Sequence, residues 1–419
     1  MTAKEPGRLA KFWRSLGPGL ITGAADDDPS GITTYSLAGA QFGTSLLWMA
    51  LASWPLMWAV QLTCARIGMV TGRGLMAAMR ERFPRPVLFA VCIALFIANS
   101  INIGADLAGM ADAAELLSGV NSHIWVIVFG AGILWAAVAL RYAVVARVLK
   151  WLALFLGAYV VTALLSSPKW GTVLHDTFVP SLPSGAEGWG MIVAILGTTI
   201  SPYLFFWQSS QEVEEEKEIG RARPQRIGAT EDELRARNSD VGAGTFVSNA
   251  AMFFIMLTTA ITLHASGMTH PKTSQEVARA LEPLAGRGSM LLYTIGIFGL
   301  GALAIPTLAG SAAYAFSELL GLRQGIDVKF SRARGFYVIM IVSVLGGVGM
   351  DFLDIDAVRA LYWTAVVNGL VAPPLLVGIA IIAADRKLMH GQPSSKFAVA
   401  LVAVTTVIMV AAGVAMFAL

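Results

Sequence analysis

The sequence predicts an all-α integral membrane protein of about eleven transmembrane helices. Of its 419 residues, 56% are hydrophobic and 14% are charged, whereas globular proteins carry about 25% charged residues. The apolar runs are long and lack the apolar–polar alternation of barrel strands, so we expect the spans to be helices. Two of these runs are interrupted by polar residues beside a proline, which favours a transporter.

The apolar runs are long enough for transmembrane helices, which need about 20 apolar residues each. In order, the predicted spans are 17–41, 44–70, 87–117, 123–141, 146–166, 188–212, 241–266, 288–317, 335–350, 357–384 and 396–418. Lysine and arginine gather in the N-terminal tail and in the link after every second span. Links of this kind face the cytoplasm. We therefore expect a multi-pass protein of the cell (inner) membrane, with its N-terminus in the cytoplasm and its C-terminus outside.

The longest polar segment, 212–240, lies between the sixth and seventh spans. Its apolar periodicity is too short for a separate domain, so we expect a cytoplasmic helical extension followed by a loop. The segment begins with an acidic run of Glu212, Glu214, Glu215 and Glu216. We interpret this run as a solvent-exposed helix face, with regulatory cation binding as the alternative.

The first and sixth spans are the interrupted ones. The first breaks at Asp28-Pro29-Ser30-Gly31, and the sixth breaks within TTISPYLFF, which has Pro202 in its middle. Proline removes a backbone donor and clashes with the preceding turn, so a helix kinks or unwinds there. Paired breaks five spans apart indicate an inverted-repeat transporter with a midplane site, and ordinary proline kinks are the alternative. We predict a tail and first five-helix repeat in 1–166, a second repeat in 167–385 and an eleventh helix in 386–419.

The two breaks together predict a cation site. Unwound carbonyls need partners within the membrane, and the C-terminal end of each inner half-helix carries partial negative charge. The expected ligands are the Asp28 carboxylate, the Ser201 hydroxyl and carbonyls near Ala25, Asp26, Thr198 and Thr199. Oxygen ligands favour Mg²⁺, Ca²⁺ or Mn²⁺ over softer metals. The metal would be a transported substrate, and the sequence has no cofactor motif and no nucleic-acid-binding patch.

Other polar residues within the spans have two interpretations each. Three adjacent carboxylates, Asp26, Asp27 and Asp28, cannot all ionise cheaply without a counter-charge. Asp26 and Asp27 either attract or relay cations at the cavity mouth, or one of them caps the unwound turn. Asp106 in the third span is either a proton or cation relay or the partner of a cationic residue. Asn249 and Asn368 either join helices by hydrogen bonds or contact the ion indirectly.

These features resemble the Nramp family of divalent-metal transporters. The resemblance is carried by the first break, by AGAQFGTSLLW after it, by ARIGMVTG at the end of the second span and by the sixth span. It implies a LeuT-type fold with two inverted five-helix repeats and one or two extra helices. That expectation agrees with the eleven predicted spans.

The chain departs from the family pattern at its metal-binding positions. The family has Asp-Pro-Gly-Asn in the first span and Met-Pro-His in the sixth. Here Asp28 is kept, but Gly31 stands at the Asn position, Ser201 at the Met position and Tyr203 at the His position. A second family His aligns with Gln208. By this resemblance, the site has lost its soft thioether ligand and has become larger, which suits a partly hydrated Mg²⁺.

The resemblance also bears on proton coupling. Asp106 matches an Asp of the family's third span, but Gly109 replaces the Glu one turn later, and Ala365 replaces the Gln of the tenth span. With the sixth-span histidines and the third-span Glu replaced, the resemblance implies a secondary-active or uncoupled carrier that imports Mg²⁺, and also Mn²⁺, similar to the Nramp-related magnesium transporters. The alternatives are a proton-coupled Mn²⁺ or Fe²⁺ symporter with a rebuilt site and an organic-solute carrier on the same fold. We do not expect an enzyme. The expected partners are the metal ion and the lipid bilayer. A monomer is plausible.

Overall fold

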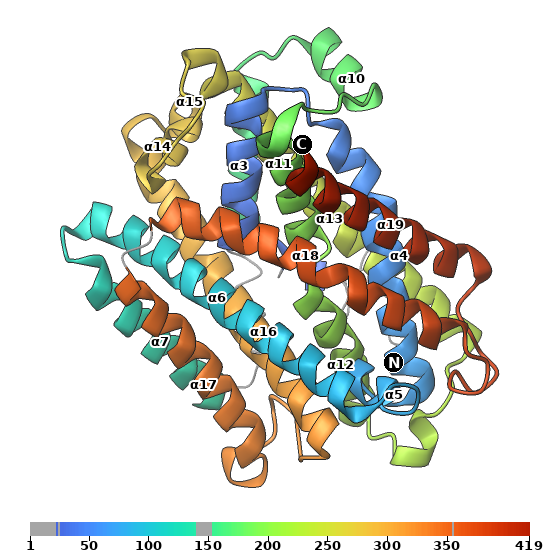
Figure 1. Ribbon diagram of the computed structural model, residues 1–419. Coiled ribbons are helices and arrows are strands. Elements are labelled where there is room, and N and C mark those ends of the chain that lie inside the picture. Colours follow the sequence, from blue (N-terminus) through green and yellow to red (C-terminus); the bar gives the residue numbers. More distant parts are fainter. Residues whose placement is uncertain (1–21, 24–25, 140–152, 354–355) are drawn as a thin grey trace, which may run out of the picture.

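Long helices lie side by side across the molecule, and each predicted span coincides with helical residues (Figure 1). The computed structural model describes residues 22–23, 26–139, 153–353 and 356–419. No strand occurs within those ranges. The long helices are α3 (Pro29–Phe42), α4 (Trp48–Thr71), α6 (Arg85–Ser118), α7 (Ser122–Ala139), α9 (Gly157–Leu165), α11 (Gly185–Thr199), α12 (Pro202–Glu218), α13 (Glu231–Thr262), α16 (Ser289–Leu320), α17 (Arg334–Met350), α18 (Ala357–Ala384) and α19 (Lys396–Ala418).

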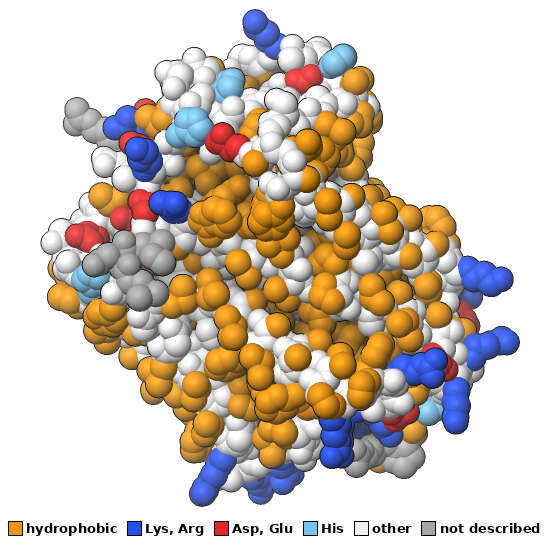
Figure 2. Space-filling model, viewed as in Figure 1, with side chains coloured by type: hydrophobic (Ala, Val, Ile, Leu, Met, Phe, Trp, Pro, Cys, Tyr) orange, Lys and Arg blue, Asp and Glu red, His pale blue; other side chains and the backbone are white. Residues whose placement is uncertain are grey.

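Apolar composition agrees with a membrane location for these helices. Among the described residues, seven helical segments are long and apolar enough to cross a membrane, and α17 is a shorter apolar helix. The remaining predicted spans correspond to α4, in which Gln61 and Arg66 interrupt the apolar run, and to the shorter α3 and α9. Figure 2 shows hydrophobic side chains over the middle of the molecule, whereas Lys and Arg gather along its lower and right-hand edges. The division into repeats at 1–166, 167–385 and 386–419 stays a prediction.

Both predicted helix breaks are present. Helix α3 begins at Pro29, directly after an extended residue, Asp28, with φ −73° and ψ 171°. Helix α11 ends at Thr199 and α12 begins at Pro202, after Ser201 in an extended conformation. Proline is favoured at the first position of a helix, where its missing N–H costs nothing. A proline is therefore the first residue of the helix that follows each break.

Close helix packing brings the sixth span against α18. A Cβ at Gly197 of α11 would lie 2.1 Å from the Ala365 carbonyl oxygen, and a Cβ at Gly369 would lie 2.5 Å from the Val193 carbonyl oxygen. Small residues allow membrane helices to approach each other in this way. The backbone of Ala365 is therefore part of a tight contact between α11 and α18, which requires glycine at 197 and 369.

The insert 212–240 is a helical extension and a loop, as predicted. Helix α12 continues to Glu218, and α13 begins at Glu231 with Thr230 and Glu233 forming a reciprocal cap. Such a capping box satisfies two N–H groups at a helix start. Between the two helices, 223–226 form a single 3₁₀ turn.

The expectation that the acidic run is a solvent-exposed face is wrong for its first member and for Glu216. Glu212 is 1% exposed and Glu216 is 6% exposed. The Glu212 carboxylate lies 2.8 Å from Nε of Arg237, whose guanidinium also donates to Asp240 across 2.7 Å and to Glu215. Buried charges are found with partners, and Arg237 supplies one from the next helix along the chain. The run therefore joins α12 to α13.

A short helix that the sequence did not indicate, α10 (Trp170–Phe178), lies against the start of α4 (Figure 1). The Thr44 hydroxyl donates to Asp176, and Trp48 Nε1 donates to the Ser181 carbonyl across 3.1 Å. Hydrogen bonds from Thr44 and then from His175 lower the pKa of Asp176, because they stabilise its charged form. These contacts fix the connection that leads into α11.

Candidate metal site

Asp28 is held at the first break by donors from three helices. Its Oδ1 accepts the Gly31 N–H of α3 across 2.7 Å, which caps that helix. Its Oδ2 accepts the side-chain amide of Asn102 of α6 across 3.3 Å and the hydroxyl of Tyr203 of α12 across 3.5 Å. A carboxylate has about four lone-pair directions, so these three bonds leave room for a cation. The capping role considered for Asp26 or Asp27 belongs to Asp28.

The end of α11 supplies hydroxyl groups from the second break. Thr198 is 2% exposed, and its Oγ1 has no hydrogen-bond partner within the part of the chain that the structure describes. The Ser201 hydroxyl lies 2.9 Å from the Gly197 carbonyl oxygen and 2.7 Å from the Thr198 carbonyl oxygen, and it can donate to only one of them at a time. Leaving a buried hydroxyl unpaired costs about 1–3 kcal/mol. A ligand that binds the Thr198 oxygen would recover part of this free energy.

The two breaks meet at Gly31. A Cβ at this position would lie 3.1 Å from Thr198 Oγ1, 3.4 Å from the Asp26 carbonyl oxygen and 3.5 Å from Asp28 Oδ1. Three oxygens of three kinds, a hydroxyl, a carbonyl and a carboxylate, thus surround one point between α3 and α11. A side chain at residue 31 would fill this point. Glycine keeps it available to a small ligand.

A second carboxylate lies beside this point on α6. Asp106 is fully buried, and neither of its oxygens accepts a hydrogen bond from a described residue, although the Ser30 N–H lies close to it. Asn102 lies four residues earlier and therefore one turn away on the same helix face. Within the described residues, Asp106 has no cationic partner, which disfavours the structural ion pair as its role.

Asp26 and Asp27 contact one hydroxyl between them. The Ser248 hydroxyl of α13 lies 2.8 Å from Asp26 Oδ2 and 3.2 Å from Asp27 Oδ1. A hydroxyl has a single hydrogen and can donate to only one of these carboxylates. The second carboxylate therefore needs a proton or a cation. The pair lies next to the site but does not take part in capping α3.

The other predicted residues lie around this centre or away from it. Gln208 donates to Glu212 across 2.6 Å and so belongs to the Arg237 cluster at the end of α12. Asn249 accepts the Ser53 hydroxyl across 2.8 Å and donates to the Thr245 carbonyl, which joins α13 to α4. Asn368 is buried on α18, which packs against α11. Ala25 lies outside the described residues.

Sequence reasoning missed two residues that contact the aspartates, Asn102 and Ser248. Asn102 lies in INIGAD, one helical turn before Asp106, so the spacing of these two polar residues was a usable signal. Ser248 is the neighbour of Asn249, and no periodicity distinguishes which of the two faces α3. Only the rotation of α13 decides this.

Comparisons with known proteins identify the family and the fold. The model of the family described as natural resistance-associated macrophage protein-like matches residues 19–419. The fold is similar to that of the manganese transporter of Eremococcus coleocola, solved in complex with an aromatic bis-isothiourea substituted compound. The TM-score is 0.77 at 17% identity, over 98% of this chain and 88% of that chain.

Two more distant solved structures share the architecture. A nucleobase-cation-symport-1 family transporter in a closed conformation has a TM-score of 0.60 at 13% identity, over 96% of this chain and 90% of that chain. A Na⁺-coupled sialic acid symporter in a substrate-bound outward-open state has a TM-score of 0.51 at 12% identity, over 96% of both chains. At these identities the likeness concerns the fold alone, which is that of the LeuT-type transporters.

Proposed function

We propose that this chain, which belongs to the Nramp family of divalent metal transporters, is a carrier that imports partly hydrated Mg²⁺, with Mn²⁺ as a second substrate. The family is one of membrane transporters, so the chain is a transporter and not an enzyme, and its metal ion is a substrate rather than a cofactor. Transport would proceed by alternating access around the two helix breaks, from outside to the cytoplasm.

The observation that carries the proposal is the set of oxygens around Gly31. Thr198 Oγ1, the Asp26 carbonyl and Asp28 Oδ1 all lie within 3.5 Å of one point between the breaks. Hard oxygen ligands suit Mg²⁺ and Mn²⁺, whereas a thioether would favour softer transition metals. Ser201 stands where the family pattern has methionine, so the site offers oxygen only. Mn²⁺ is also hard enough for such a site, and the manganese transporter of similar fold makes it the first ion to compare with Mg²⁺.

We further propose that import is not coupled to protons. The family's histidines in the sixth span are replaced by Tyr203 and Gln208, and neither residue titrates readily near neutral pH. The membrane potential alone favours entry by about 2.3 kcal/mol per charge per 100 mV, which is about 4.6 kcal/mol per 100 mV for a divalent ion. An uncoupled carrier would therefore still accumulate the ion.

Uptake of Mg²⁺, Mn²⁺ and Ca²⁺ into proteoliposomes, with simultaneous recording of internal pH, tests both parts of this proposal. We expect saturable Mg²⁺ and Mn²⁺ uptake that rises with an inside-negative potential and leaves internal pH unchanged. Acidification that follows Mn²⁺ uptake would instead support a proton-coupled symporter with a rebuilt site. Competition by amino acids or other organic solutes, without metal flux, would support an organic-solute carrier on the same fold.

Replacing Thr198 with Val separates metal binding from folding. The substitution removes an unpartnered buried hydroxyl, so thermal stability should stay unchanged or rise. Loss of one oxygen ligand should raise the Mg²⁺ concentration for half-maximal uptake by about tenfold, which corresponds to about 1.4 kcal/mol. Thr405→Val is the matched control, because Thr405 is buried on α19 and bonds only the Leu401 carbonyl of its own helix. Equal uptake by the two variants would exclude Thr198 as a ligand.

A further inference from the structure

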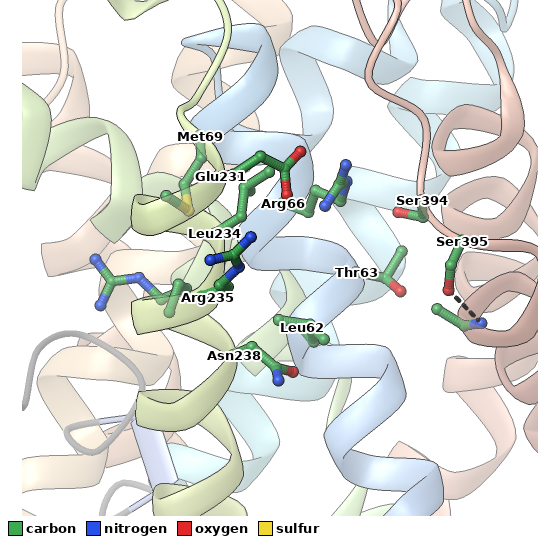
Figure 3. Close-up of a pocket in the computed structure, with 12 residues that line it drawn as sticks. Leu62, Thr63, Arg66, Met69, Glu231, Leu234, Arg235, Asn238, Ser394 and Ser395 are labelled. Carbon is green, nitrogen blue, oxygen red and sulfur yellow. Dashed lines mark hydrogen bonds between the residues drawn. The ribbon is translucent and has the colours of Figure 1, made fainter.

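A cavity of about 230 Å³ lies between α4, α13 and the N-terminus of α19 (Figure 3). None of the residues that line it belongs to the candidate metal site. Its apolar side is formed by Leu62, Met69, Leu234 and Ala398. Its polar side is formed by arginines and small polar side chains from all three helices. A cavity with both an apolar and a charged side, bounded by helices of a membrane protein, suits an amphipathic ligand.

The walls of this cavity are held in place by hydrogen bonds. Arg66 of α4 is partly buried, and its Nε donates to the Gln392 carbonyl across 3.3 Å. The Gln392 side chain bonds both the N–H and the carbonyl of Ala229, at 3.0 and 2.8 Å. The loop before α19 is therefore tied to α4 and to the segment before α13. Among the described residues, the two terminal nitrogens of Arg66 have no hydrogen-bond partner, so they remain available to a ligand.

The opposite wall offers hydrogen-bond donors. Ser394 is 8% exposed, and its Oγ has no hydrogen-bond partner in the described ranges. Figure 3 shows this hydroxyl pointing toward the cavity, opposite Arg66. The neighbouring Ser395 caps α19 by accepting the Ala398 N–H across 3.1 Å, and the other N–H groups of the first turn lie at the positive end of the helix dipole. Helix N-termini with a side-chain donor favour phosphate groups.

The side chains that line the cavity carry one more positive than negative charge, apart from Arg237. Arg66 and Arg235 line it together with one carboxylate, that of Glu231; Asp232, outside the lining, lies 3.6 Å from Arg235, but it is 94% exposed and solvent screens this pair. Arg237 also lines the cavity, but its guanidinium is engaged by Glu212, Glu215 and Asp240. A group with a single negative charge would balance this set. A headgroup that also carried an ammonium would restore the excess.

We propose that this cavity binds the phosphate of an anionic phospholipid whose remaining headgroup is uncharged, as in phosphatidylglycerol. Arg66, the Ser394 hydroxyl and the N-terminus of α19 would hold the phosphodiester, and Asn238 would contact the headgroup hydroxyls. The acyl chains would follow the apolar side between α4 and α19. Basic pockets between helices near the membrane surface bind anionic headgroups in this way. The lipid would tie α19 to α4 and α13.

Native mass spectrometry of the full chain in mild detergent tests this site. We expect phosphatidylglycerol to bind at least about tenfold more tightly than phosphatidylcholine, and Arg66→Gln to weaken phosphatidylglycerol binding by about tenfold or more, because a charge-assisted hydrogen bond is lost. The control is Arg332→Gln, an exposed arginine outside this cavity, which should bind the lipid as the wild type does.

Ser394→Ala is a second test in case the Arg66 variant fails to fold. We expect this substitution to preserve folding, because Ser394 Oγ has no hydrogen-bond partner among the residues that the structure describes. It should keep the wild-type melting temperature but lose the stabilisation that added phosphatidylglycerol confers on the wild type. Equal lipid binding by the wild type, Arg66→Gln and Ser394→Ala would overturn the site. Inorganic phosphate or glycerol phosphate that displaces the lipid at equal concentration would show that the ligand is a free anion, and this result would overturn the lipid assignment.

Discussion

Asp28→Ala abolishes Mg²⁺ and Mn²⁺ uptake in proteoliposomes loaded with a divalent-sensitive dye. The substitution removes the only side-chain carboxylate among the three oxygens around Gly31, and with it the charge that compensates for dehydration of the ion. Loss of the α3 cap costs a further ~1 kcal/mol, and the Asn102 and Tyr203 donors lose their acceptor. We expect uptake to fall to the rate of protein-free vesicles.

Asp28→Asn distinguishes binding from folding. Asparagine caps helices as well as aspartate does, so α3 should start at the same residue. Its amide nitrogen replaces the Oδ2 acceptor of Asn102 and Tyr203, so the melting temperature should fall, but by less than in Asp28→Ala, which also loses the cap. The amide lacks the negative charge, so metal uptake should still be lost. Asp232→Asn serves as the control for a general change in charge, because the Asp232 side chain is 94% exposed. Wild-type Mg²⁺ flux in Asp28→Asn would refute the assignment of Asp28 as the metal ligand.

Arg237→Gln destabilises the protein more than any exposed substitution should. The Arg237 side chain is 10% exposed and contacts Glu212 and Asp240, whose side chains are 1% and 2% exposed. Removing one member of a buried ion pair leaves an uncompensated charge and costs about 3–5 kcal/mol. The packing of α12 against α13 should loosen, and the melting temperature should fall sharply.

The same helix provides a matched control for this prediction. Arg235→Gln changes an arginine whose side chain is 76% exposed, so its effect should be within about 0.5 kcal/mol. The double variant Arg237→Gln with Glu212→Gln should recover part of the lost stability, because it removes a charge that the single variant leaves unpaired. Identical melting temperatures for Arg235→Gln and Arg237→Gln would contradict a structural role for the cluster.

Much of the fold could be predicted because each transmembrane span is recognised from the apolar composition of its own segment. Pro29 and Pro202 mark both helix breaks, since proline removes a backbone donor wherever it occurs in a helix. The candidate site could be predicted as far as its two segments, and Asp28, Gly31 and Thr198 meet there. Thr198 presents its hydroxyl, however, whereas the predicted ligand was its carbonyl, which lies 2.7 Å from the Ser201 hydroxyl. The structure places Gln208 and Asn249 in other contacts, since Gln208 donates to Glu212 and Asn249 accepts the Ser53 hydroxyl.

The sequence by itself determined the membrane class, the approximate positions of the predicted spans and the two breaks, and it predicted a site of oxygen ligands. Each of these follows from the composition or conformational preference of a short segment. Only the tertiary structure decided that Glu212 is buried against Arg237, that Asn102 donates to Asp28, and that Asp26 and Asp27 share the Ser248 hydroxyl. These contacts join residues far apart in the chain, and they depend on how each helix is rotated about its axis. Hydropathy alone does not specify that rotation when a helix is apolar on most of its faces.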